Sequence, residues 1–144
     1  GPERARLEAL VHTLQLEALE RFTGDREPGD LLGVMDLYVN SCVDEGFGIA
    51  VVEAMLAGLP VVIADAGSHP ELIIDGDCGF LYEPGSPEDL AVRLQWLIDH
   101  PVDARVTGAR ARLHAQRQFS PDRFMTGYLS LMQPVAGCLD PVLQ

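Results

Sequence analysis

The sequence has no lysine, few cysteines and no long apolar run, and these shortages exclude several classes of protein. All ten basic residues are arginines, against 22 acidic residues, and the formal net charge is −12. Affinity for a phosphate backbone comes from clustered cations, so an acidic chain without a basic run is a poor candidate for binding nucleic acid. No apolar run approaches the roughly 20 residues that a membrane-spanning helix needs. We therefore expect neither a nucleic-acid partner nor a transmembrane segment.

The three cysteines, Cys42, Cys78 and Cys138, are widely spaced along the chain. A disulfide framework requires a dense and even-numbered set, so a reducing cytoplasm is the simpler inference. The expected location is the cytoplasm, with the full-length protein either free or peripheral at the inner face of a membrane. The four histidines share no spacing that would suit a metal ion.

What the chain does contain is typical of a single globular domain of alternating helices and strands. It has 144 residues, of which 47% are hydrophobic. Apolar periodicity, glycine stops and Ser-Pro helix starts predict seven helical segments. They are 2–16, 30–35, 48–57, a short turn at 70–74, 87–99, 103–118 and 121–132. Four short strands are expected, one at 20–23 that Gly24 ends and the others at 37–40, 60–64 and 79–82.

Strands that alternate with helices indicate right-handed crossovers and a parallel, doubly wound sheet of the α/β class. Residues 1–100 are expected to supply the sheet and its crossover helices. Residues 101–144 are expected to form a C-terminal helical appendage, because three helices follow one another there.

The segment most suggestive of chemistry is Asp44–Met55, where a buried strand is expected to hand over to a helix. Doubly wound sheets bind ligands in this crevice. Free backbone amides and the helix dipole would make an anion site there that suits a diphosphate. From spacing alone, a plain glycine turn flanked by two solvated glutamates is an equally good interpretation.

A family resemblance favours the first interpretation. The run EGFGIAVVEAMLAGLPVV, with Glu45 and Glu53 eight positions apart, resembles the motif of the retaining GT-B glycosyltransferases of the group 1, or family 4, type. The resemblance continues through Asp65-Ala66-Gly67, Pro70-Glu71-Leu72 and Pro84-Gly85-Ser86-Pro87, and it covers roughly residues 1–130. It implies that the chain is the Rossmann-like, nucleotide-sugar-binding half of a GT-B fold.

The resemblance also assigns roles to residues of this sequence. Glu45 would be the catalytic residue, contacting the donor sugar beside the reacting carbon, and Glu53 would bind the ribose hydroxyls. The sugar and phosphates would be held by the turn residues Gly46, Phe47, Gly48, Ile49 and Ala50. The base would be bordered by Thr23, Gly24 and Arg26. Transfer would proceed with retention, without a bound metal or cofactor, from a nucleotide-sugar donor to a glycan or lipid-linked acceptor.

The sequence departs from the family pattern in two respects. Ser68 stands where the family commonly has a second glycine after Gly67. The Arg/Lys pair that clamps the diphosphate and the whole acceptor-binding N-terminal domain have no counterpart. In family terms residues 20–23 and 37–40 would be the third and fourth strands, and the strands between them in the sheet would precede Gly1. We therefore expect a domain that is incomplete at its N-terminus and belongs to a longer protein, or one that closes the gap by rearrangement.

The sequence leaves alternatives open for function and for two residues. The first hypothesis is a glycosyltransferase fragment that binds nucleoside diphosphates but does not transfer sugar alone. The alternatives are a non-catalytic nucleotide-binding or interaction module of the same fold and, less well matched, a sugar-nucleotide epimerase. His69 lies on the loop expected to face the sugar, and either it contacts the ligand or it makes no ligand contact. Glu71 either caps its short helix or touches the donor.

Overall fold

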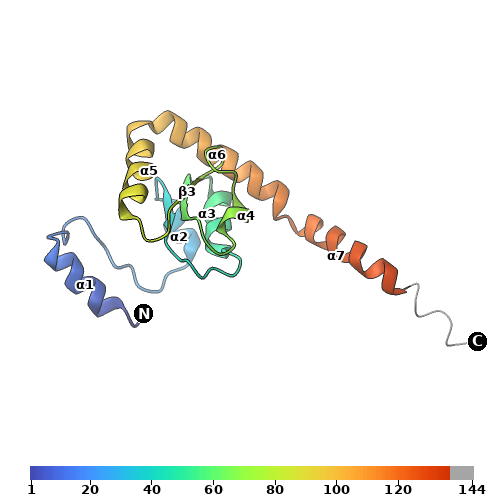
Figure 1. The fold of residues 1–144 in the computed structure, drawn as a ribbon, viewed down its shortest axis with the longest axis horizontal. Coiled ribbons are helices and arrows are strands. Elements are labelled where there is room, and N and C mark those ends of the chain that lie inside the picture. The colour runs from blue at the N-terminus through green and yellow to red at the C-terminus, as the bar shows by residue number, and fades with distance from the viewer. Residues whose placement is uncertain (137–144) are drawn as a thin grey trace, which may run out of the picture.

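The computed structural model describes residues 1–136, with side chains as far as residue 132; Cys138 lies outside the described residues. The helices are α1 Arg4–Thr13, α2 Pro28–Leu32, α3 Ile49–Ala57, α4 His69–Leu72, α5 Pro87–Asp99, α6 Pro101–Gln118 and α7 Pro121–Ala136. The strands are β1 Tyr38–Asn40, β2 Val61–Ala64 and β3 Phe80–Tyr82. Helices α2 to α6 surround the sheet, α1 lies to one side, and α7 projects from the body (Figure 1).

The three strands form one parallel sheet in the order β1-β2-β3. Tyr38 is in register with Val61, and Val62 with Phe80. Each strand is joined to the next through a helix, as a parallel sheet requires. The predicted α/β class with a parallel sheet is therefore confirmed.

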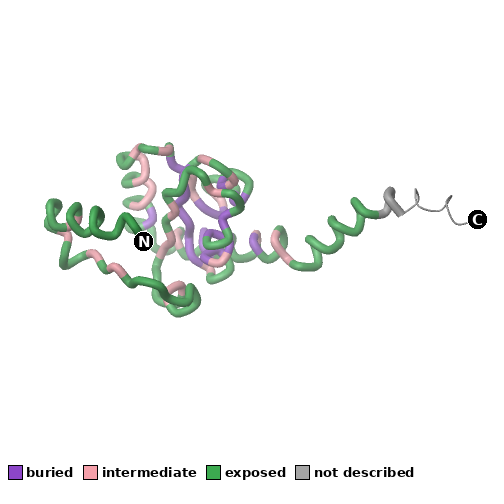
Figure 2. Tube along the Cα trace, turned by 90° about the horizontal axis from the view of Figure 1, so that it is seen from below, coloured by how far each residue is buried: buried purple, intermediate pink, exposed green. Residues whose placement is uncertain are grey.

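Strand β2 is the centre of the domain, and all four of its residues are buried. Val61 and Ile63 face α3 and α6, while Val62 and Ala64 face α5. Because a strand covered on both faces has no polar side, the β-branched run of β2 fits this position. The buried part of the chain is confined to this sheet and the helices around it (Figure 2).

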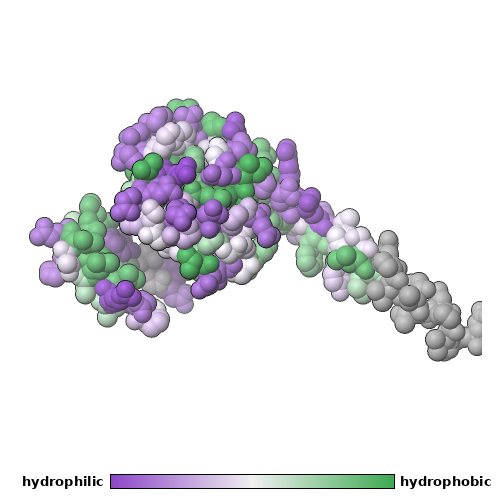
Figure 3. Space-filling view, in the orientation of Figure 1, coloured by the Kyte–Doolittle hydropathy of each residue, from purple (hydrophilic) through white to green (hydrophobic). Residues whose placement is uncertain are grey.

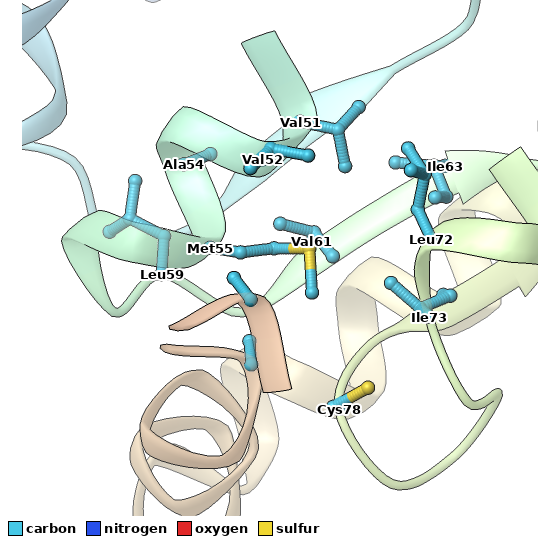
Figure 4. Packing of buried hydrophobic residues seen from close by; sticks show 12 residues of the cluster. Val51, Val52, Ala54, Met55, Leu59, Val61, Ile63, Leu72, Ile73 and Cys78 are labelled. Carbon is cyan, nitrogen blue, oxygen red and sulfur yellow. The ribbon is translucent and has the colours of Figure 1, made fainter. Parts of the chain in front are cut away.

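The larger core cluster packs α3 and α6 against one face of the sheet. Met55 of α3 is fully buried and lies beside Val61 in Figure 4. Helix α6 approaches closely at Gly108, where a Cβ would overlap the carbonyl oxygen of Gly58 and stand 3.1 Å from the nitrogen of Pro60. Burying the twelve side chains of this cluster is the main source of stability for the domain.

The helix boundaries follow the local signals in the sequence. At α5 the Ser86 hydroxyl accepts a hydrogen bond of 3.2 Å from the amide of Asp89, and Pro87 occupies the first turn. At the end of α3, Gly58 adopts φ 85°, and its amide bonds the carbonyl oxygens of Ala54 and Met55. Both boundaries were predicted. Helix α6 begins at Pro101, two residues before the predicted start.

The strand predicted at residues 20–23 is wrong. These residues are irregular, and they pair with no strand in the part of the chain that the structure describes. Local composition favoured a strand, but a strand exists only where a neighbour completes its hydrogen bonds. The segment instead follows α1, where Arg4 lies 5.6 Å from the ring centroid of Phe22. The outer edge of β1 is likewise without a partner strand among residues 1–136.

No helix among the described residues is long and apolar enough to cross a membrane.

Candidate functional site

The candidate site is the loop between β1 and α3, at the carboxyl edge of the sheet. Gly48 ends this loop and is the N-cap of α3, with φ 82°. A side chain at this position would be strained, since only glycine adopts such a conformation without cost. It would also stand 2.7 Å from Cδ1 of Leu72 in α4. The glycine therefore lets α4 close directly beneath the start of α3.

Backbone donors at the start of α3 are free, as the sequence predicted. The amides of Gly48, Ile49 and Ala50 donate no hydrogen bond to any described residue. Gly46, Ile49 and Ala50 are exposed to solvent. Unpaired amides at the positive end of a nine-residue helix attract an anion, so the site suits a phosphate or diphosphate.

The two glutamates of the motif come near the same phenol. Glu45 and Glu53 are both partly buried, one on the loop and one midway along α3. Burial raises the pKa of Tyr38, and the negative charges of Glu45 and then Glu53 raise it further. Tyr38 starts β1 and packs against the core below α3. Both carboxylates therefore act electrostatically on one tyrosine that sequence reasoning overlooked, since a tyrosine opening a strand is no signal by itself.

The loop that carries Glu45 rests on the loop after β2. The amide of Ser68 donates a 3.2 Å hydrogen bond to the carbonyl oxygen of Glu45. Gly67 lies against the backbone of Glu45, where a Cβ would meet the Glu45 carbonyl oxygen at 2.7 Å. Ser68 replaces a glycine of the family pattern, and its amide still makes this contact. The loop after β2 therefore supports the loop after β1 at Glu45, although the two loops are far apart in the sequence.

His69 is fully buried, so the interpretation of this residue as a direct ligand contact is not supported. Its Nδ1 lies 2.9 Å from the carbonyl oxygen of Ala64, the last residue of β2. Nε2 of His69 and Oγ of Ser68 are buried without a hydrogen-bond partner among the described residues. The other histidines follow the surface prediction more closely, since His12 and His100 are exposed and His114 is half-buried.

Phe47 lies beside the last two helices. Its ring packs edge-on against Phe119 at 5.8 Å between centroids. A hollow lined by Phe47, Glu53 and residues of α7 continues from there. Residues 121–132 of α7 are all exposed. Apolar side chains gather at the surface of both α7 and α1 (Figure 3).

The residues predicted to border a base lie on the irregular segment between α1 and α2. Thr23 and Gly24 line a hollow with residues of α1, and Arg26 lines a second hollow with residues of α2. Neither hollow includes Glu45 or Glu53. The Arg26 Nε atom donates to the carbonyl oxygen of Thr23 at 3.4 Å. Their role toward a base stays a prediction.

Within residues 1–132, no three His, Cys, Asp or Glu side chains come close enough together to hold a metal ion. The absence of a metal requirement likewise stays a prediction.

Glu71 is exposed, and its carboxylate makes no hydrogen bond to a described residue, so the alternative of a helix cap has no support.

A parallel sheet covered by helices on both faces, with a glycine-capped helix start at its carboxyl edge, defines a Rossmann-like α/β domain. Comparison with known proteins narrows this class. The family described as glycosyl transferases group 1 matches residues 1–114. The chain belongs to this family.

Individual proteins are also similar to this chain. The chain is 31% identical to the N-acetyl-alpha-D-glucosaminyl L-malate synthase of Bacillus anthracis over 136 residues, which is 94% of this chain and 36% of that enzyme. It superposes on sucrose-phosphate synthase from Thermosynechococcus elongatus with a TM-score of 0.84, at 27% identity, over 94% of this chain and 35% of the other.

A third similar protein was solved with a nucleotide sugar. The chain matches Anabaena HepE in complex with UDP-glucose with a TM-score of 0.75 and 30% identity, over 96% of this chain and 36% of HepE. In these comparisons the chain spans little more than a third of the length of the proteins it matches.

Proposed function

We propose that this chain is the nucleotide-sugar-binding part of a glycosyltransferase. The arrangement that carries the proposal is the start of α3, where three amides without an acceptor lie in the sequence between Glu45 and Glu53. Membership of the group 1 family and the likeness to HepE with UDP-glucose support it. The nucleotide-sugar donor is the proposed partner, and residues 1–100 and 101–144 are the proposed sheet and helical parts of its binding domain.

The diphosphate binds at the positive end of α3. The amides of Gly48, Ile49 and Ala50 have no acceptor among the described residues, and Ile49 and Ala50 are exposed, so a diphosphate oxygen can take their hydrogen bonds. Gly46 and Phe47 complete the cradle around the sugar and phosphates. This arrangement stabilises the charge that develops on the departing diphosphate, which is an electrostatic role that needs no metal ion.

The glutamates divide the remaining contacts. Glu53 lies one turn into α3, where its carboxylate accepts hydrogen bonds from the two hydroxyls of a ribose. Glu45 precedes the amides on the loop before α3 and orients the donor sugar at the reacting carbon. We also propose that the sugar is transferred with retention. The base is bordered by Thr23, Gly24 and Arg26.

The acceptor, a glycan or a lipid-linked sugar, binds elsewhere. The described helices and loops offer a donor site, and the rest of the enzyme, including an N-terminal domain, supplies the acceptor site. We therefore expect no sugar transfer by this chain alone. Incubation with a UDP-sugar and a chain-length series of glycan acceptors tests this point, and any transfer above background contradicts it.

Backbone-amide NMR during titration with UDP, GDP, ADP and TDP tests donor binding. Shifts should centre on residues 46–53, and the nucleoside diphosphate with the lowest dissociation constant identifies the base. Glu53→Ala should weaken the ribose contact by about tenfold or more, because a hydrogen bond to a charged group contributes about 1.5–3 kcal/mol.

Glu88→Ala is the matched control, since Glu88 is an exposed glutamate in the first turn of helix α5 and has no role in the proposed site. It should leave binding unchanged. Well-dispersed spectra that respond to none of the four nucleotides, or a response lost equally in both variants, would contradict the proposal.

A further inference from the structure

His69 is a buried polar residue for which the proposed function has no use. Its side chain is fully buried, although it starts the four-residue helix α4 at the edge of the candidate site. Nε2 has no hydrogen-bond partner among the described residues. A buried polar atom without a partner destabilises the fold, and an aliphatic side chain would fill the space without that cost. The other nitrogen of the ring must therefore account for the presence of a histidine.

That other nitrogen bonds the end of the central strand. Nδ1 lies 2.9 Å from the carbonyl oxygen of Ala64. A carbonyl oxygen only accepts, so Nδ1 carries the proton, and in the neutral ring Nε2 is then the unprotonated nitrogen. The same carbonyl oxygen also accepts a 2.8 Å hydrogen bond from the amide of Ala66. The two donors close the chain between Ala64 and His69 into a compact turn.

This turn is the support of the proposed donor loop. From it, the amide of Ser68 bonds the carbonyl oxygen of Glu45 at 3.2 Å, and Gly67 packs on the Glu45 backbone. Leu72, one helical turn after His69, fits under Gly48 at the start of α3. Both ends of the loop that presents Glu45 and the free amides therefore rest on residues within three positions of His69.

We propose that His69 is a positioning residue: by hydrogen-bonding β2 through Nδ1–H, it sets the turn 64–69 and through it the position of Glu45 and Gly48. Its importance for ligand affinity rests on the proposed function, whereas its effect on the loop does not. The hydrogen bond joins residues only five positions apart, His69 and Ala64. It nevertheless connects the buried central strand to the more exposed loops of the proposed ligand site.

The tautomer of the wild-type His69 ring can be measured directly. In the full chain labelled with ¹⁵N-histidine, long-range proton–nitrogen correlation should show His69 in the Nδ1–H tautomer with a slowly exchanging ring proton. The Nε2–H tautomer would overturn the proposal, because Nδ1 could not then donate to Ala64. This measurement needs no variant and stays decisive if a substitution prevents folding.

Substitution of His69 by asparagine or by glutamine distinguishes the roles of the two ring nitrogens. The side-chain nitrogen of asparagine can stand near the position of Nδ1, whereas that of glutamine reaches toward Nε2. In His69→Asn, hydrogen exchange of the Ser68 amide should stay within about threefold of wild type, because the donor to Ala64 is kept. In His69→Gln and His69→Leu it should be about tenfold or more faster, which is the effect of losing one buried hydrogen bond.

The exchange rate of the Ser68 amide is compared with that of the Val62 amide in the middle of β2. A merely structural role would raise both rates together, and that outcome, or equal behaviour of the Asn and Leu variants, would overturn the proposal. His100→Asn is the matched control, since its exposed ring also has Nδ1 2.8 Å from a backbone carbonyl, that of Trp96, on α5. It should change neither rate.

Nucleotide affinity distinguishes the two proposals from each other. If UDP, GDP, ADP or TDP binds the wild-type chain, His69→Asn should keep the dissociation constant and His69→Leu should raise it by about tenfold. If none binds, the proposed function fails, while the exchange rates and the ring tautomer still decide the role of His69.

Discussion

Gly67 lies so close to Glu45 that a Cβ on Gly67 would stand 2.7 Å from the carbonyl oxygen and 3.1 Å from the nitrogen of Glu45. The contact joins the loop after β2 to the loop after β1. Gly67 also adopts φ 56°, a region in which a side chain is strained. The main chain around the proposed catalytic glutamate is therefore fixed by a residue 22 positions later, through backbone contact alone.

Gly67→Ala should displace Glu45. The added methyl group cannot fit at 2.7 Å from the carbonyl oxygen of Glu45, so the loop must shift. We expect nucleoside diphosphate binding to weaken by about tenfold and the amide shifts to centre on residues 44–48. Gly85→Ala is the control, because Gly85 has φ 79° and no atom within 4 Å of an added Cβ. An equal loss of binding in both variants would show that backbone strain, not the contact, is responsible.

Gly108→Ala should destabilise the whole domain. Its Cβ would overlap the carbonyl oxygen of Gly58 where α6 crosses the turn before β2. Overpacking of a rigid backbone contact costs about 1–3 kcal/mol, which urea unfolding measures directly. Gly127→Ala in α7 meets nothing within 4 Å and should be neutral or slightly stabilising. A Gly108 variant as stable as wild type would mean that α6 can move away from the sheet without loss.

Tyr38→Phe should alter the alkaline limb of the stability curve. The pKa of Tyr38 is raised in the folded state above the value of 10.0 for a free tyrosine, by burial first and by Glu45 and Glu53 next. Above pH 10.0 the unfolded chain loses this proton while the folded chain keeps it, so stability falls as the pH rises toward the folded pKa. The Phe variant lacks this proton, so it should lose less stability than wild type.

Urea unfolding between about pH 9 and about pH 11 measures that difference. Glu45→Gln, which removes one of the two charges, should lower the pKa of Tyr38 and give an intermediate loss. Parallel curves for wild type and Tyr38→Phe would contradict the proximity of the phenol to the two carboxylates.

The two cysteines in the described part of the chain should differ sharply in reactivity. Cys42 is exposed on the loop after β1, whereas Cys78 is 1% exposed and burial raises its pKa. Because the thiolate is the reactive form, Cys78 should react with a thiol reagent at least about tenfold more slowly than Cys42. Mass spectrometry of timed labelling in a Cys138→Ser background measures both rates. Equal rates would indicate that the loop containing Cys78 opens readily.

Local signals predicted most of the elements correctly. Ser86 and Pro87 mark the start of α5, and Gly58 marks the end of α3, because caps and left-handed glycines act within a few residues of the chain. The apolar run of β2 predicted a strand buried on both faces. Residues 20–23 were also predicted to be a strand and yet form none, because a strand depends on a neighbour that no local signal reports.

The sequence by itself determined the α/β class, the family, and the loop at residues 44–48 followed by a helix, because these depend on periodicity, on caps and on the spacing of two glutamates along one segment. Only the tertiary structure decided what surrounds Glu45. Gly67 and Ser68 reach it from the loop after β2, and His69 is buried rather than facing a ligand. The physical reason is that a parallel sheet brings the ends of separate strands together, here β1 beside β2 with Tyr38 opposite Val61, and no pattern within one segment encodes that contact.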